Sequence, residues 1–259
     1  MKRFVVVCAP KCGSSVFGHS ISTNTDIVYL DCIYTRNKKS LIERFNCFGR
    51  NKTGTFTNLI NYMIEDEYFY NYFIEFRKKD WIRYTDSIVS SSDSFLGFKW
   101  HPYFDGFMTG NETHLLPEQL IEYADNKNIQ YVIIERKNRF EQFVSLYISQ
   151  KTNYFGYHDR NIPDFYHNGI FTVDDEISYL SSMAQLMKRS QSVCDKLSQR
   201  NNSILLYYED IIDNKVDYKI TEYFKINNYI CDTKRIYRPY SSFFDQYDRV
   251  REIYESVSI

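Results

Sequence analysis

Short apolar runs alternate with longer segments of mixed polarity along the whole chain. Five runs of four or five residues are almost continuously apolar, as is typical of parallel strands buried on both faces. They cover residues 4–8, 27–30, 95–99, 131–135 and 204–207. The intervening segments predict helices at residues 14–22, 40–45, 56–77, 117–127, 139–151, 174–199 and 211–224. The alternation predicts an α/β fold in which a single domain, residues 1–259, has a central, mainly parallel sheet flanked by helices.

Charge and hydropathy narrow the possible functions. The 259 residues include 32 Lys and Arg against 33 Asp and Glu, a net charge of −1. No overall positive field therefore attracts nucleic acid. No apolar run approaches the ~20 residues that cross a bilayer. We expect neither a nucleic-acid partner nor a membrane span.

The N-terminus and the cysteines both favour a soluble cytoplasmic protein. The apolar stretch that follows Lys2 and Arg3 is shorter than that of a secretory signal and ends at Pro10. The six cysteines form no CxxC pair and no Cys/His cluster at zinc spacing. We therefore expect free thiols in a reducing compartment.

The first apolar run leads into a turn that combines a lysine, a glycine and two serines, Pro10-Lys11-Cys12-Gly13-Ser14-Ser15. Amides at the start of the next helix have no partner within the helix, and its dipole favours an anion there. Gly13 permits a close approach to the backbone, and Lys11 adds a positive charge. No Lys follows Gly13, as a Walker A loop requires, and Ser14 stands where a cysteine phosphatase built on Cys8 needs Arg. The turn predicts an anion site outside these two classes.

A second basic cluster, Arg136, Lys137 and Arg139, lies between the fourth apolar run and a helix. Positive charge at a helix start opposes the helix dipole, so an anionic ligand would explain the cluster. Ser145 lies away from the centre of the core-facing stripe of that helix. The stripe consists of Phe140, Phe143, Val144 and Tyr147. Both clusters follow predicted parallel strands, at the sheet edge where open α/β sheets bind ligands. Together they predict two phosphate-sized anion sites at one edge of the sheet.

These segments resemble sulfotransferases that use 3′-phosphoadenosine 5′-phosphosulfate (PAPS). Residues 10–15 match the 5′-phosphosulfate loop of that family in order, with Cys12 where serine is commoner. Arg136 and Ser145 match the pair that contacts the 3′-phosphate of the nucleotide. Their separation is longer than in many cytosolic members, which leaves Lys137 as a substitute for Arg136.

The resemblance continues toward the C-terminus. The sequence of residues 141–147 is similar to that of the corresponding segment in bacterial carbohydrate sulfotransferases of the trehalose type. Residues 205–211 are similar to a strand-end segment found late in the family, in which Glu209 would hold a basic residue and Asp210 would cap a helix. A GxxGDW-type loop is missing near the C-terminus. The candidates for nucleotide contacts there are Arg235 and Arg238.

The resemblance implies a P-loop-like sulfotransferase fold and in-line transfer of a sulfuryl group from PAPS to a hydroxyl, with release of 3′,5′-ADP and no metal. Lys11 would neutralise charge on the leaving oxygen, and Ser14 and Ser15 with the turn amides would hold the phosphosulfate. His101, in a segment that looks like the Lys-x-His of cytosolic members, is the expected general base, beside Lys99. The alternative bases are Asp26, Asp31 and His19.

Other interpretations stay open. A nucleotide or small-molecule kinase with a degenerate P-loop would need Mg²⁺ ligands, commonly an Asp at a strand end, whereas the strand end here, Glu135-Arg136, is basic. A catalytically inactive nucleotide-binding domain would keep the fold. The expected acceptor is a small molecule or glycan. Aromatic residues form 18% of the chain and are dense at residues 62–76, where they would line an acceptor cleft or fill the core.

Overall fold

The computed structural model describes residues 3–24, 27–30, 81–90, 96–104, 117–152, 170–227, 229–231 and 239–259. The strands of these segments are β1 (Arg3–Val7), β2 (Val28–Leu30), β3 (Leu96–Trp100), β4 (Gln130–Glu135) and β5 (Ser203–Tyr207). The α-helices are α1 (Ser14–Asn24), α5 (Trp81–Ser90), α7 (Pro117–Asn126), α8 (Arg139–Thr152), α10 (Ile177–Ser198), α11 (Tyr208–Ile212), α12 (Asp217–Phe224) and α13 (Tyr247–Ser256). Two 3₁₀ helices are η1 (Asp174–Glu176) and η2 (Tyr240–Phe243).

The described strands form one parallel sheet in the order β2-β3-β1-β4-β5. Each strand coincides within one residue or so with one of the apolar runs, so the predicted parallel α/β sheet is confirmed. Residues Phe4 to Val7 of β1 are fully buried. A central parallel strand is covered on both faces, which is why its sequence is apolar at every position rather than at every second one.

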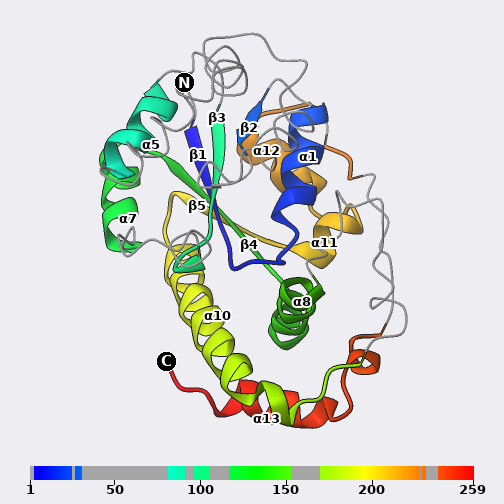
Figure 1. The fold of residues 1–259 in the computed structure, drawn as a ribbon. Helices are drawn as coiled ribbons and strands as arrows, with labels where there is room; N and C mark the ends of the chain where they lie inside the picture. Colours follow the sequence, from blue (N-terminus) through cyan, green and yellow to red (C-terminus); the bar gives the residue numbers. More distant parts are fainter. Residues whose placement is uncertain are drawn as a thin grey trace, which may run out of the picture.

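Two helical layers cover the sheet, and each has its own apolar cluster (Figure 1). Helices α1, α11 and α12 pack on the face that carries Phe4, Val6 and Cys8 of the β1 segment. On the other face α10 packs against β4 and β5, and α8 and α13 pack against α10 and η2. Rings from α8, α13 and η2 supply much of this second cluster, including Phe143 and Tyr254 with centroids 5.0 Å apart.

The order of the strands places a topological switch point between β1 and β4. The chain leaves β1 into α1 on one face of the sheet, and it leaves β4 toward α8 and α10 on the opposite face (Figure 1). The two neighbouring strands therefore have connections that diverge at their carboxyl ends. Parallel α/β sheets bind ligands at such a switch point. Both predicted anion-binding segments begin here.

Several helix predictions needed correction. The helix expected at residues 211–224 is two helices, α11 and α12, because Asn214 adopts the left-handed conformation at φ 54° and the Lys215 amide turns back to the Asp210 carbonyl at 2.9 Å. The helices α5 and α13 were not predicted. The helices expected at residues 40–45 and 56–77 lie outside the described residues, as does the aromatic segment 62–76.

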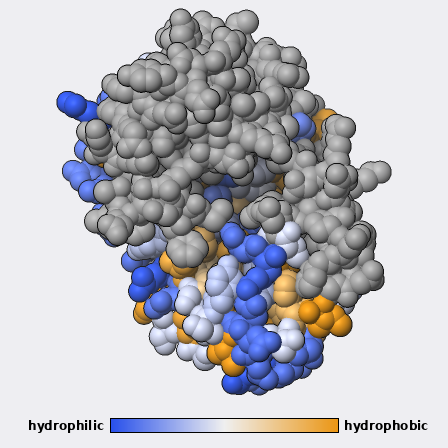
Figure 2. Space-filling view, viewed as in Figure 1, coloured by the Kyte–Doolittle hydropathy of each residue, from blue (hydrophilic) through white to orange (hydrophobic). Residues whose placement is uncertain are grey.

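Three further observations concern the cysteines, the length of the helices and the surface. Cys8, Cys12, Cys194 and Cys231 are buried free thiols. Among the helices that the structure describes, none has the length and apolar character needed to cross a bilayer. On the face drawn in Figure 2, hydrophilic residues interleave with smaller hydrophobic areas over the described surface around α8 and α13.

Candidate functional site

The turn after β1 has a strained backbone and leads directly into helix α1. Lys11 has a φ of 62° and Gly13 a φ of 88°, both in the left-handed region. A non-glycine residue there is uncommon, and such strain clusters at ligand-binding turns. The Gly13 carbonyl accepts the Phe17 amide at 3.1 Å, so α1 begins at Ser14 and its first amides point out of the helix end.

The position of Gly13 is set by a close aromatic contact. A Cβ on Gly13 would lie 2.0 Å from Cδ2 of Tyr208, which is half-buried at the start of α11. Glycine is therefore required by the ring and by the positive φ. The predicted approach of Gly13 to a phosphate stays a prediction.

The same ring contacts Arg136 at the end of β4. The Arg136 guanidinium carbon lies 4.7 Å from the centroid of Tyr208, and Nη1 donates to the Tyr240 hydroxyl at 3.2 Å. Burial opposes its charge, but Tyr240, Tyr208 and Glu209 raise the pKa of Arg136 above its usual value. Its buried Nε has no hydrogen-bond partner among the residues that the structure describes.

Tyr208 thus connects the two segments that were predicted to bind phosphates. One part of its ring covers Gly13 of the turn after β1, and Arg136 at the end of β4 lies over the ring. Gly13 and Arg136, more than a hundred residues apart in the sequence, therefore lie on the same ring at the carboxyl ends of β1 and β4.

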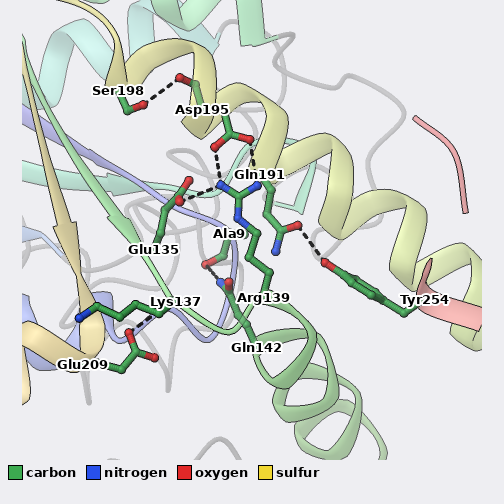
Figure 3. A network of polar contacts seen from close by, with 10 residues as sticks. All are labelled: Ala9, Glu135, Lys137, Arg139, Gln142, Gln191, Asp195, Ser198, Glu209 and Tyr254. Carbon is green, nitrogen blue, oxygen red and sulfur yellow. Dashed lines mark hydrogen bonds and ion pairs between the residues drawn. The ribbon is translucent and has the colours of Figure 1, made fainter. Parts of the chain in front are cut away.

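The other two cations of the second cluster are paired with carboxylates. Arg139 lies between Glu135, at 2.8 Å, and Asp195 of α10, whose Oδ2 is 2.9 Å from Nη1 (Figure 3). Lys137 Nζ contacts Asp210 at 2.6 Å, and its amide donates to Glu209 at 3.1 Å. Lys137 and Arg139 are therefore both paired with carboxylates, and the role of Lys137 as a substitute for Arg136 stays a prediction.

Of the two acidic residues after β5, Asp210 has a different role from the expected one and Glu209 has the expected one. The residue before α11 is Tyr207, and it makes no side-chain cap; Asp210 lies inside the helix and pairs with Lys137. The expected cap by Asp210 is therefore wrong. Glu209 does hold the basic segment, through the Lys137 backbone amide.

Lys99 and His101 lie beside the turn, because β3 pairs with β1 in register from Arg3↔Leu96 to Val7↔Trp100. His101 Nδ1 is 2.7 Å from the Cys8 carbonyl oxygen. A carbonyl only accepts hydrogen bonds, so Nδ1 carries the proton, and Nε2 is the basic nitrogen of neutral His101. Cys8 Sγ also lies 3.4 Å from Nδ1. This tautomer is the one that a general base needs.

The two thiols at the turn form a hydrogen-bonded pair whose pKa values shift in opposite directions. Burial raises the pKa of the Cys8 thiol well above its ordinary value, and the hydrogen bond with Cys12 adds to the shift. Burial also opposes ionisation of Cys12, but hydrogen bonds from Cys8 and Ser14 and the charge of buried Lys99 lower its pKa. Within this pair, Cys12 is therefore the more acidic thiol.

Helix α8 contributes a residue that the sequence analysis missed. The buried amide Nε2 of Gln142 donates to the carbonyls of Ala9, at 3.1 Å, and Pro10, at 2.9 Å. Ser145 is buried one turn farther along α8 on the same side as Gln142. Gln142, Ser145 and Ser149 form a polar i, i+3, i+7 row beside the apolar stripe, a pattern that could have identified them.

The structure leaves some predicted residues without a position. Asp26, Asp31, Arg235 and Arg238 lie outside the described residues. Tyr240, two residues after Arg238, contacts Arg136. His19 lies on α1 about 7.5 Å along the axis from Ser14 by helix geometry.

Comparison with known proteins adds a weak likeness of fold. No family model and no curated protein sequence matches the chain. Among solved structures, it is similar to the sulfotransferase domain from the curacin biosynthetic pathway, with 13% identity and a TM-score of 0.46, over 93% of this chain and 76% of that one. Such a likeness carries no argument about activity.

Proposed function

We propose that this protein is a sulfotransferase that moves a sulfuryl group from PAPS to a hydroxyl group of a small-molecule or glycan acceptor. One observation carries the proposal: the ring of Tyr208 contacts both Gly13, in the turn after β1, and Arg136, at the end of β4. A nucleotide with a phosphosulfate at its 5′ position and a phosphate at its 3′ position has two anionic ends, one for each of these two segments.

The chemistry of the two ends differs in a way that suits PAPS. The turn offers the amides at the start of α1 and the charge of Lys11, which suit the charge that develops during transfer. Arg136 offers a fixed planar cation with a buried Nε that lacks a partner in the described residues. A guanidinium held in this way suits a phosphate that is bound but does not react.

The reaction needs a base, a charge-neutralising group and an in-line arrangement. The acceptor oxygen forms a bond to sulfur while the bond between sulfur and the bridging phosphate oxygen breaks, and 3′,5′-ADP leaves with that electron pair. Lys11 neutralises the leaving oxygen. His101 Nε2 receives the proton of the acceptor hydroxyl, and its Nδ1–H bond to the Cys8 carbonyl keeps the imidazole oriented.

A kinase with a degenerate P-loop is the competing proposal. It would need Mg²⁺ ligands near the transferred phosphate. The carboxylate at the end of β4, Glu135, is already bound to Arg139, and the next residue is the cation Arg136. These contacts favour the sulfotransferase over the kinase.

Ligand-dependent thermal unfolding separates the two enzymes. A ligand that binds only the native state stabilises it by about 2.7 kcal/mol at 100 times its Kd. We expect 3′,5′-ADP to raise the melting temperature and ATP with Mg²⁺ to leave it nearly unchanged. A larger shift with ATP and Mg²⁺ would overturn the proposal. Transfer of labelled sulfate from PAPS to a panel of sugars, lipids and phenols then tests catalysis and identifies the acceptor; binding of 3′,5′-ADP without transfer to any of them would favour the inactive domain.

A further inference from the structure

Gln142 is a buried polar residue with no place in the chemistry proposed above. Its side chain is 1% exposed and reaches from α8 across the sheet end to the turn after β1. Both hydrogens of its amide are used, on the Ala9 carbonyl at 3.1 Å and the Pro10 carbonyl at 2.9 Å (Figure 3 shows the contact with Ala9). The amide thus binds the two carbonyls that come directly before Lys11.

These two hydrogen bonds determine the orientation of the peptide bond between Pro10 and Lys11. In a trans peptide the carbonyl and the following amide point in opposite directions. With the Pro10 carbonyl directed toward α8, the Lys11 amide points away from α8. If this peptide rotated, it would present a carbonyl oxygen where the turn otherwise presents an N–H donor. An anion favours the donor and is repelled by the oxygen.

The bonds also connect the turn to the second anion-binding segment. Gln142 and Ser145 lie one helical turn apart on α8, whose first residue follows Arg136 by only three positions. The distance from the turn to this segment is therefore held by an interaction between two buried groups. Burial makes such a hydrogen bond directional and costly to leave unmade.

A second buried glutamine provides a comparison within the same helical layer. Gln191 of α10 is 4% exposed, and its Oε1 accepts the Tyr254 hydroxyl at 3.2 Å (Figure 3). The two residues have the same size, polarity and depth. Gln191 bonds to a core tyrosine, whereas Gln142 bonds to the turn.

We infer that Gln142 is a positioning residue: it holds the Ala9 and Pro10 carbonyls away from the bound anion and fixes the distance between the turn and Ser145. The inference rests on the proposed nucleotide site. It predicts that loss of the two hydrogen bonds weakens nucleotide binding more than loss of a comparable buried bond elsewhere.

The experiment compares Gln142→Met with Gln191→Met, which remove the polar atoms at similar volume. Affinity for 3′,5′-ADP is measured by calorimetry, and stability by urea unfolding without ligand. We expect both variants to lose stability, but only Gln142→Met to lose about 10- to 100-fold in affinity, as a misplaced site does. Gln191→Met should stay within about twofold of wild type. Equal affinity losses in the two variants would overturn the inference.

A pH profile keeps the test decisive if Gln142→Met does not fold. In Gln142→Glu the protonated carboxyl donates one hydrogen bond to the turn, and the ionised carboxylate repels both carbonyls. The loss in 3′,5′-ADP affinity relative to wild type should therefore grow as pH rises, and it should grow less in Gln191→Glu, which adds the same charge away from the turn. Parallel profiles would overturn the inference.

Failure of the proposed function has a separate signature. If wild type and Gln191→Met fail to bind 3′,5′-ADP, the proposed function fails, and this inference fails with it. If both bind it and Gln142→Met binds it equally well, only the inference about Gln142 is wrong.

Discussion

The ends of β1 and β4 both carry basic residues, yet the two regions are built differently. After β1, the proposed anion site depends on the backbone: Lys11 and Gly13 lie at positive φ, and α1 begins at Ser14. After β4 there are three cations, but carboxylates bind Lys137 and Arg139. Arg136 instead contacts an aromatic ring and a hydroxyl. The number of charges in a segment does not tell which of them is available to a ligand; their partners do.

The largest effect is expected from the proposed base beside the β1 turn. Because His101 Nε2 accepts the acceptor proton, His101→Ala should lower kcat about 10²- to 10⁴-fold while 3′,5′-ADP binding is retained. Steady-state kinetics of sulfuryl transfer from PAPS measures kcat, and calorimetry measures the binding of 3′,5′-ADP. Near-normal turnover in this variant, with loss of turnover in Asp31→Ala, would move the base to Asp31.

Substitution of a lysine should lower turnover much more in the turn after β1 than after β4. Lys11→Ala removes the charge that meets the leaving oxygen, so kcat should fall about 10²- to 10³-fold. Lys137→Ala is the matched control, because Asp210 neutralises this exposed lysine, and turnover should stay within about twofold. Comparable losses in both variants would remove the distinction between the two strand ends.

The two arginines after β4 should affect different properties. Substitution of Arg136 should change nucleotide affinity, and substitution of Arg139 should change the free energy of unfolding. Arg136→Gln should weaken 3′,5′-ADP about 10- to 100-fold, as expected for a charge-assisted hydrogen bond, and should leave 5′-AMP binding almost unchanged. Arg139→Gln leaves buried Glu135 without its cation, and should lower the free energy of unfolding by about 1 to 3 kcal/mol without this selectivity. Calorimetry and urea unfolding of the same samples measure both. The opposite assignment would show that Arg139 holds the ligand.

The contact between the two regions can be tested through Gly13. Gly13→Ala places a methyl against the Tyr208 ring at a positive φ, so we expect a loss of about 1 to 3 kcal/mol in the free energy of unfolding. In the Tyr208→Ala background the steric part of this loss should disappear. A double-mutant cycle by urea unfolding measures the coupling. Additive losses would mean that the ring does not restrict the turn.

The smallest effect concerns Glu135. Burial raises the pKa of Glu135 above its ordinary value of 4.5, against the opposing effect of Arg139. The native state then holds this proton more strongly than the unfolded chain, so stability falls as pH rises from about the ordinary value through the raised one. Glu135→Gln should flatten this part of the stability profile relative to wild type. An unchanged slope would show that Glu135 does not titrate in that window.

The sequence was sufficient for the sheet and for placing the two candidate segments at strand ends, but not for the partners of their side chains. Strands buried on both faces are continuously apolar, so β1 to β5 could be predicted from single runs. The pairing of Arg139 with Asp195 and the contact of Arg136 with Tyr240 join distant parts of the chain, so their spacing in the sequence carries no signal. Gln142 belongs to a polar row with Ser145 and Ser149 that the sequence displays, but its contact with the Pro10 carbonyl joins distant parts of the chain and has no signal in that row.

The central claim is that one nucleotide uses both strand ends. Titration calorimetry with 3′,5′-ADP and 5′-AMP tests it most directly, since the two ligands differ only in the phosphate assigned to Arg136. We expect one site per chain, and we expect 3′,5′-ADP to bind at least about tenfold more tightly than 5′-AMP, as one charge-assisted hydrogen bond provides. Equal affinities for the two ligands, or tighter binding of ATP with Mg²⁺, would contradict it.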